Sequence, residues 1–278
     1  MKILALDIGG TAVKYGLFEN GTEQLGQFSV KNEDGREDLV GRLTAFCTET
    51  NADYIAVSTP GPFDYATGTG WMTHKLPSLY GVSLKDAFKQ HLPAARVCFM
   101  NDATAFAFGV MHEIPHLKTG AFSCVMLGTG LGYANVIDGV VQLNEKQTPS
   151  HPMWNMPFLD GIAEDYVSTR ALITAAEANG FAFSNIKDMA EAAIAGNKHL
   201  QRCFDEFGRY LGLCVEQQRG VDRFDQLVIG GQISKSFHLM KNGFESATSL
   251  PHSLVHDTAT CALYGLYEFA TEQKEAFV

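Results

Sequence analysis

The stretch LALDIGGTAVKYGLFENG, residues 4–21, places two apolar runs on either side of a short loop that contains an acid and two glycines. The run at residues 3–8 predicts a buried strand, and the run at 13–18 predicts its neighbour. Asn20-Gly21 follows as a turn signal. The loop between the two strands is therefore the unusual part of this stretch.

Composition and charge limit the classes of protein to which the chain can belong. Its 278 residues are enough for two lobes around a shared cleft, and 46% hydrophobic content is ordinary for a globular protein. The formal net charge of −10 argues against a broad surface for nucleic acid or anionic membrane. We therefore expect no nucleic-acid partner, and any phosphate has to be bound locally.

Cysteine usage and hydropathy point to the interior of the cell. The six cysteines are scattered without a C-x-x-C pair, which predicts reduced thiols in the core. The first apolar run is too short for a signal peptide, and no later run approaches the ~18 residues of a membrane-spanning helix. The sequence therefore predicts a cytoplasmic protein with no membrane partner.

The order of apolar runs and helical patterns predicts an α/β fold. In the first half we expect a strand pair within 3–30, a helix at about 38–50, strands at 54–58 and 96–100, a loop-rich segment at 59–83, and helices near 84–91 and from Asp102. In the second half we expect strands at 121–128 and 226–231, a long amphipathic helix around 200–214, and a closely packed helix within 260–270.

The second half begins by repeating the plan of the first. The apolar run AFSCVMLG at 121–128 leads through a Gly/Thr loop into YANVIDG, which ends in an Asp-Gly turn signal. Both halves therefore run strand, Gly/Thr loop, second strand and turn. This pattern predicts two lobes that share one plan.

Two loops rich in glycine are candidate phosphate-binding loops. In the first, glycines let the backbone approach an anion and Thr11 offers a hydroxyl, while Asp7 can hold Mg²⁺ directly or through water. The second is GTGLG at 128–132. Each also fits an ordinary glycine-containing hairpin, and neither is a P-loop, because G-x-x-x-x-G-K-[ST] is absent.

Three further segments allow both a functional and a purely structural interpretation. In CFMNDATAFAFG, residues 98–109, Asp102 can act as a general base toward a hydroxyl, but Asn101-Asp102 also fits a helix N-cap. The segment 58–84 is too long for a simple connection and either lines a ligand or forms a rigid surface loop. IGGQIS at 229–234 fits a surface for a flat base or ribose, or a left-handed turn before a helix.

Taken in order, these segments resemble the motifs of the ROK family of sugar kinases, within the actin-like ATPase and sugar-kinase superfamily. ALDIGGT resembles the first phosphate motif, STPGPFD the sugar-side loop, NDATAFAFG the catalytic Asn-Asp segment, LGTGLG the second phosphate motif, and VIGGQIS the adenosine motif. Together they span nearly the whole chain.

The resemblance implies an α/β fold of two actin-like (ribonuclease H-like) lobes that flank an interdomain cleft. The small lobe would comprise residues 1–112 and a C-terminal helix at about 262–278, and the larger lobe residues 113–261. The resemblance also implies a homodimer.

The same resemblance implies transfer of the γ-phosphoryl group of Mg·ATP to a sugar hydroxyl. Asp102 would accept the hydroxyl proton, Asn101 and Gly61 would contact the sugar, and Asp7 would position Mg²⁺ or its water. The residues that would bind the nucleotide are Gly9, Gly10, Thr11, Gly128, Thr129 and Gly130 at the phosphates and Gly230 and Gly231 at the adenosine.

The chain departs from the family in the segment that follows the second phosphate hairpin. The family's zinc-binding cysteines are absent there, so we expect no structural zinc. GIAEDYVS resembles the end of that segment, with Glu164 as the sugar-binding acid. His151 corresponds to the family histidine or is an ordinary loop residue. Its partner acid is missing at the family spacing, where Glu145 is a displaced candidate, and Lys75 stands where the family often has a sugar-contacting Asn.

Two other functions remain open at this point. One is a sugar-sensing or regulatory protein that keeps the cleft without turnover, although the chain begins directly at the first phosphate strand, without a DNA-binding segment before it. The other is an ATP-dependent protein of the same superfamily that forms acyl phosphates or assemblies. Asp7 and Asp102 favour chemistry, and the Asn-Asp segment and the P-G-P loop favour a polyol substrate.

Overall fold

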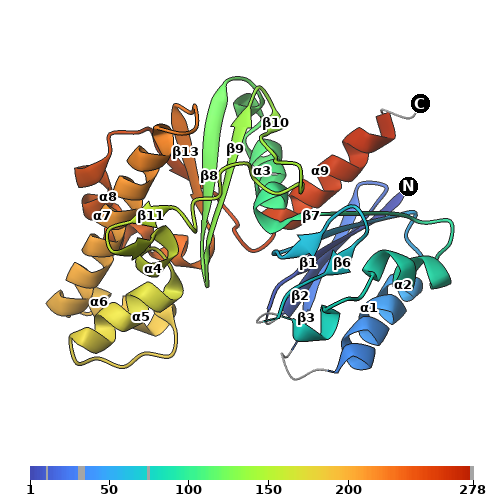
Figure 1. Ribbon diagram of the computed structural model, residues 1–278, viewed down its shortest axis with the longest axis horizontal. Coiled ribbons are helices and arrows are strands. Elements are labelled where there is room, and N and C mark those ends of the chain that lie inside the picture. The colour runs from blue at the N-terminus through green and yellow to red at the C-terminus, as the bar shows by residue number, and fades with distance from the viewer. Residues whose placement is uncertain (11, 31–34, 74–75, 276–278) are drawn as a thin grey trace. The chain divides into compact units, whose positions relative to one another are not determined.

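The structure, a computed structural model, describes residues 1–10, 12–30, 35–73 and 76–275, and it divides into two compact units (Figure 1). Unit 1 contains Met1–Pro115, Leu143–Thr148 and the described residues from Thr260 onward. Unit 2 contains His116–Gln142 and Pro149–Ala259. Each unit is built around its own five-stranded sheet.

The sheet of unit 1 has the strand order β3-β2-β1-β4-β7. β1, β2 and β3 are antiparallel neighbours, whereas β4 and β7 continue the sheet parallel to β1. The strands are β1 (Lys2–Ile8), β2 (Ala12–Glu19), β3 (Thr22–Ser29), β4 (Tyr54–Thr59) and β7 (Arg96–Asn101). The helices are α1 (Arg36–Thr50), α2 (Leu84–His91), α3 (Asp102–Glu113) and α9 (Cys261–Glu275).

Helices cover both faces of this sheet, which explains why β1 is almost entirely apolar. Alternate residues of the strand point to opposite faces. Leu4 and Leu6 therefore pack in a core with α1 and α2, while Ile3 and Ala5 pack in another with α3 and α9. The rings of Phe108 in α3 and Phe269 in α9 are 5.3 Å apart.

The long segment between β4 and α2 is folded rather than a simple connection. It contains the short hairpin β5 (Phe63–Asp64) and β6 (Thr69–Gly70) and the 3-10 helix η1 (Pro77–Leu79). Trp71 N donates to Pro62 O at 3.0 Å, and the Gly61-Pro62 peptide bond is cis. The Trp71–Pro62 bond joins the P-G-P loop, residues 60–62, to the chain that follows the hairpin.

The sheet of unit 2 has the order β10-β9-β8-β13-β14. Its strands are β8 (Ala121–Leu127), β9 (Leu131–Ile137), β10 (Val140–Val141), β13 (Gln226–Gly230) and β14 (His252–Leu254). The helices are η2 (Pro115–Lys118), α4 (Ala163–Tyr166), α5 (Thr169–Ala178), α6 (Ile186–Ile194), α7 (Lys198–Arg219), η3 (Gln232–Ser236) and α8 (Phe237–Ala247). A two-stranded ribbon, β11 (Pro157–Phe158) and β12 (Gly161–Ile162), precedes α4. The core packs Val125 and Leu127 of β8 against helices such as α7.

The two sheets repeat one plan, as the sequence predicts. β1 pairs antiparallel with β2 and parallel with β4, and β8 pairs antiparallel with β9 and parallel with β13. The predicted turns are also present, because Asn20-Gly21 and Asp138-Gly139 have positive φ at both residues, as in the hairpin turns that such pairs favour. The α/β prediction with two related lobes is confirmed.

Some helices are longer or additional relative to the prediction. α7 runs to Arg219, and α5, α6 and α8 lie in segments for which the sequence analysis gave no element. Among the residues that the structure describes, no helix has both the length and the apolar character needed to cross a membrane.

Candidate functional site

Several of the predicted residues meet at one edge of the sheet in unit 1. Asp7 pairs in register with Ser58 of β4, and Thr59 pairs in register with Asn101 of β7. Because β1, β4 and β7 are parallel, their carboxyl ends lie at the same edge. Asp7 and the pair Asn101-Asp102 are thus two strands apart, which corresponds to about 10 Å at the usual strand spacing.

Asp7 is held by two neighbours. Ser58 Oγ donates to Asp7 Oδ1 at 2.8 Å, and Lys14 Nζ lies 3.8 Å from Asp7 Oδ2. Lys14, which belongs to none of the sequence motifs, faces Asp7 directly in the β1–β2 register. A carboxylate at this edge is the type of ligand that Mg²⁺ prefers, and Mg²⁺ is often held by one or two carboxylates and the phosphates of a nucleotide.

The first phosphate loop is a tight connection. Gly9 N donates to Ala12 O at 3.0 Å, so this amide takes part in the hairpin. A Cβ atom added at Gly10 would meet no atom within 4 Å, which leaves the backbone open on that side. Thr11 lies outside the described residues.

Asn101 is the N-cap of α3, and Asp102 is its first residue. Asn101 Oδ1 accepts from Ala103 N at 3.0 Å, and Asp102 Oδ1 also accepts from that amide at 2.9 Å. The structural interpretation of Asn101 as a cap is therefore confirmed. Both side chains are partly exposed at the sheet edge, so the cap does not remove them from the surface.

Tyr65 is a residue of this edge that the sequence analysis missed. Its hydroxyl donates to Thr59 O and accepts from Asn101 Nδ2, both at 3.1 Å. Burial raises the pKa of Tyr65, and the charge of Asp102 also raises that pKa, against the opposite effect of the bond from Asn101. The phenol thus stays protonated and supports Asn101. Gly61 lies beside it, since a Cβ added there would be 3.7 Å from the Tyr65 hydroxyl oxygen.

In unit 2, the loop between β8 and β9 is tied to the helices that follow. Gly128 N donates to Gly130 O at 3.1 Å, and the amide and the hydroxyl of Thr169 both donate to Gly128 O at 2.9 Å. Thr129 is exposed at the tip. This loop is therefore fixed at its base while its tip remains accessible.

Glu164 lies against the same loop. Its Oε2 accepts from Leu131 N at 2.9 Å. A Cβ added at Gly130 would lie 2.5 Å from that oxygen, so the close approach depends on glycine at this position. Glu164 and the second candidate phosphate loop thus form one cluster.

The candidate adenosine motif lies next to this cluster in the sheet. Gly230, at the end of β13, pairs in register with Met126 of β8. Gly231 then turns with φ 87° and ψ 168°, and Ser234 Oγ donates to Gly231 O at 2.7 Å. The predicted αL turn is therefore not present, because the ψ of Gly231 is far from the αL value of about 47°; Gly231 adopts a different glycine-specific conformation before the helix. The ligand surface at this motif stays a prediction.

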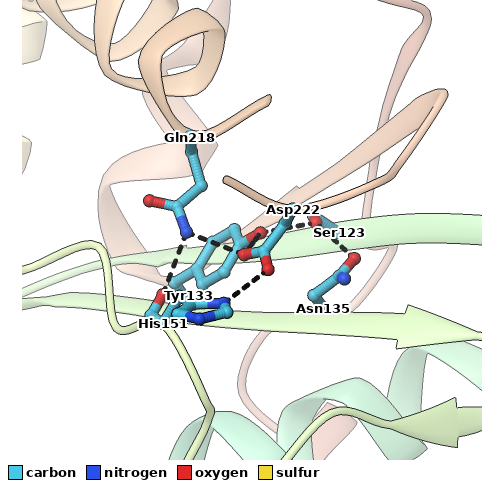
Figure 2. A network of polar contacts seen from close by, with 6 residues as sticks. All are labelled: Ser123, Tyr133, Asn135, His151, Gln218 and Asp222. Carbon is cyan, nitrogen blue, oxygen red and sulfur yellow. Dashed lines mark hydrogen bonds and ion pairs between the residues drawn. The ribbon is translucent and has the colours of Figure 1, made fainter. Parts of the chain in front are cut away.

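His151 belongs to a polar network in unit 2 (Figure 2). Its Nδ1 is 2.7 Å from Asp222 Oδ1. The carboxylate that contacts this histidine is thus that of Asp222. The role of Glu145 as a displaced sugar-binding acid stays a prediction. His151 lies in a loop, as the interpretation of an ordinary loop residue predicts, but its ring contacts the Asp222 carboxylate. No sequence motif indicated Asp222.

Two other predictions are not tested at these positions. Lys75 lies outside the described residues. Among the residues that the structure describes, no group of three or more His, Cys, Asp or Glu side chains is placed to hold a metal ion. The expected absence of structural zinc stays a prediction.

The repeated sheets and the strand-end acids define a two-unit α/β protein of the actin-like type. In a comparison with protein families, the model of the ROK family matches residues 3–145, about half of the sequence. The chain belongs to the ROK family. An N-acetylmannosamine kinase of Haemophilus influenzae is 26% identical over 155 residues, which are 54% of this chain and 51% of that protein. The chain thus matches about half the length of this curated relative.

Solved structures share the fold over nearly the full length. A ROK family protein of Streptococcus pneumoniae in complex with sucrose has a TM-score of 0.83 at 22% identity, and the match covers 99% of this chain and 100% of that one. A ROK family glucokinase of Streptomyces griseus in complex with glucose and AMPPNP has a TM-score of 0.81 at 19% identity, with 98% and 100% covered. The actin-like α/β fold is therefore established.

Proposed function

We propose that the chain is an ATP-dependent sugar kinase, which transfers the γ-phosphoryl group of Mg·ATP to a hydroxyl of a hexose or a hexose derivative. The observation that carries the proposal is the arrangement of Asp7, Asn101 and Asp102 at one edge of the sheet in unit 1. Membership of the ROK family supports it, and so do the kinase names of relatives and the glucose and AMPPNP bound to a similar structure.

The proposed chemistry assigns the proton to Asp102. The sugar hydroxyl oxygen attacks the γ-phosphorus, its proton passes to the Asp102 carboxylate, and the bond to the bridging oxygen breaks so that ADP leaves. Asn101 would position a neighbouring hydroxyl. Its Oδ1 has two lone pairs and its amide two N–H groups, and the contacts to Ala103 and Tyr65 use one of each.

Asp7 is the residue that we propose to hold Mg²⁺, directly or through water. When bound, this ion would neutralise charge on the phosphates of the nucleotide. Ser58 would fix the carboxylate by its hydrogen bond, and Lys14 supplies a positive charge beside it. The donor set is consistent with Mg²⁺, because a single carboxylate with nucleotide phosphates and water is a common arrangement for this ion.

The remaining binding roles follow the motifs. We assign the phosphates to Gly9, Gly10, Thr11, Gly128, Thr129 and Gly130 and the adenosine to Gly230 and Gly231. We assign Glu164, His151 and Gly61 to the sugar. For Glu164 the proposal uses Oε1, because Oε2 already accepts from Leu131 N. Its Oε1 takes no part in that bond and is offered to a hydroxyl.

Two features of the assembly belong to the same proposal. We propose that the functional lobes are residues 1–112 with the C-terminal helix at about 262–278, and residues 113–261. We also propose a homodimer, which rests on family resemblance. Light scattering coupled to size-exclusion chromatography measures the mass in solution, and a monomer at enzymatic concentrations would contradict the dimer.

The test is ADP release from Mg·ATP with a panel of hexoses, N-acetylhexosamines and β-glucosides. Asp102→Asn keeps the size of the side chain and removes the base, so turnover should fall by about 10²–10⁴-fold, while nucleotide binding is kept. Asp86→Asn is the matched control, because Asp86 is also an acid in the first turn of a helix of unit 1.

The outcomes separate the roles. Turnover of Asp102→Asn at the level of the wild type would refute the general base. No turnover on any sugar, with sugar binding still visible as a shift in melting temperature, would refute the kinase and favour the sugar sensor.

A further inference from the structure

The network around His151 joins five parts of unit 2 (Figure 2). We call it the Asp222 network. Its six members are Ser123 of β8, Tyr133 and Asn135 of β9, His151 of the loop after β10, Gln218 of α7, and Asp222 of the turn that follows α7.

The end of α7 fixes the carboxylate of Asp222. Asp222 N donates to Gln218 O at 2.9 Å, a bond between residues four positions apart like those within the helix. Gln218 Nε2 donates to Asp222 Oδ2 at 2.7 Å, and Tyr133 Oη donates to the same oxygen at 2.7 Å. The Asp222 side chain is only 6% exposed. Its position is thus determined by both main-chain and side-chain bonds.

A buried carboxylate is costly unless it accepts hydrogen bonds, and Asp222 accepts three. Burial raises the pKa of Tyr133 far above its ordinary value, and the charge of Asp222 acts in the same direction. Tyr133 therefore remains a phenol and a donor. Ser123 Oγ lies 2.9 Å from the Tyr133 hydroxyl and donates to Asn135 Oδ1 at 3.0 Å, so the network extends into the sheet.

The same groups hold both the main chain and the ring of His151. Gln218 Nε2 has two hydrogens, and the second donates to His151 O at 3.0 Å. The ring contacts Asp222 through Nδ1, while the His151 side chain as a whole is 53% exposed. One edge of the imidazole is thus anchored to a buried carboxylate, and the ring still reaches solvent.

The chemistry of the pair fixes the tautomer. An ionised carboxylate only accepts hydrogen bonds, so the proton lies on Nδ1 of His151. In the neutral ring, Nε2 then carries a lone pair and is an acceptor. A hydroxyl group can donate to this nitrogen.

We propose that Asp222 is the positioning residue of His151: it keeps the proton on Nδ1, so that Nε2 accepts a hydrogen bond from a sugar hydroxyl. The inference rests on the proposed function, because the sugar is the ligand. Gln218 and Tyr133 act through Asp222 and do not touch the sugar.

The first experiment reads the tautomer directly. Imidazole ¹⁵N chemical shifts of His151 are measured in the free protein at about pH 8.5, above the ordinary imidazole pKa of about 6.5. We expect the Nδ1–H form in the wild type and a shift toward the Nε2–H form in Asp222→Asn. Asp225→Asn, with the same charge change in an exposed position three residues later, should leave the tautomer unchanged. An Nε2–H form in the wild type would overturn the proposal, even if Asp222→Asn failed to fold.

The second experiment is a double-mutant cycle with His151→Ala and Asp222→Asn, read as kcat and KM for the sugar and for ATP. Asp222→Asn should lower kcat/KM for the sugar by about 10–100-fold, by analogy with the loss found for carboxylates that orient metal-binding histidines, and leave the KM for ATP unchanged. In the His151→Ala background, Asp222→Asn should add less than about threefold, because it acts through the ring.

The two proposals fail in distinguishable ways. Full, independent losses from the two substitutions would overturn the positioning role while leaving the kinase intact. A wild-type protein that phosphorylates no sugar would refute the proposed function. In that case the wild-type tautomer and its response to Asp222→Asn would still decide whether Asp222 sets the state of His151.

Discussion

Gly231→Ala should destabilise unit 2 more than any ordinary glycine substitution, because two separate constraints meet at this residue. Its φ of 87° and ψ of 168° fall in a region that is essentially restricted to glycine. A Cβ added there would lie 2.5 Å from Leu127 N and still nearer to Leu127 O. These atoms belong to the main chain at the end of β8, so they cannot turn aside.

The magnitude follows from the two constraints. The unfavourable dihedral angles cost about 1–3 kcal/mol, and forcing an extra carbon into a packed position costs about 1–3 kcal/mol. The free energy of unfolding should thus fall by about 2–6 kcal/mol. Gly120→Ala is the matched control, because Gly120 also has a positive φ, 94°, but its added Cβ would meet no atom within 4 Å. It should show only the dihedral contribution.

The two tryptophans allow each unit to be followed separately, since Trp71 lies in unit 1 and Trp154 in unit 2. In a Trp71→Phe background, urea unfolding monitored by Trp154 fluorescence reports on unit 2. Gly231→Ala should lose more unfolding free energy than Gly120→Ala, by about 1–3 kcal/mol. Equal losses would show that the close approach of β13 to Leu127 is not a constraint, and the reasoning from packing would be wrong.

Two further predictions concern the second phosphate loop and the buried thiols. Gly130→Ala should displace the Glu164 carboxylate from Leu131 N and lower the free energy of unfolding in urea by roughly 0.5–1.5 kcal/mol. In a Glu164→Ala background the same substitution should cost nothing. An undiminished loss of unfolding free energy in that background would contradict the contact. Burial raises the pKa of the Cys47 and Cys124 thiols from 9.0 to about 12, so the unfolded chain releases these protons first and stability should decline from about pH 9 toward pH 12. Melting temperatures measured across that range, with Cys47→Ala as comparison, check this, and a flat profile would refute it.

The parts of the fold that the sequence predicts are those encoded by short-range patterns. Asn20-Gly21 and Asp138-Gly139 specify their turns locally, since both residues of each pair adopt positive φ. The run at residues 3–8 is apolar throughout because helices cover both faces of the first sheet. Repetition of this plan in the two halves then indicates two related units.

The helices that the analysis missed had weaker or competing signals. Ser168 and Asn185 cap α5 and α6 by accepting from amides three residues later. In each case the sequence signal for the start of the helix is a single capping residue. In α8, Gly243 lowers helix propensity. The structure explains the glycine at this position. A Cβ at Gly243 would clash with Asp205 O of α7, so close packing of α7 and α8 requires glycine.

Within the candidate site, residues at strand ends were predictable, whereas long-range partners were not. Asp7 and Asp102 stand out because each follows an apolar run. Tyr65 and Asp222 had no comparable signal, since the His151–Asp222 contact joins residues 71 positions apart and no periodic pattern encodes such a pair. Asp222 lies in RGVDRF, where a charge after a helix normally suggests a solvated turn.

Asn101 shows why the structural and functional interpretations of one residue need not exclude each other. An N-cap uses one lone pair of the side-chain oxygen, and support from Tyr65 uses one N–H group. The cap also orients the side chain at the sheet edge, which a ligand-binding role requires. The two interpretations are compatible, because a cap that leaves hydrogen-bonding capacity on the exposed side is itself the means by which the fold can offer Asn101 to a hydroxyl.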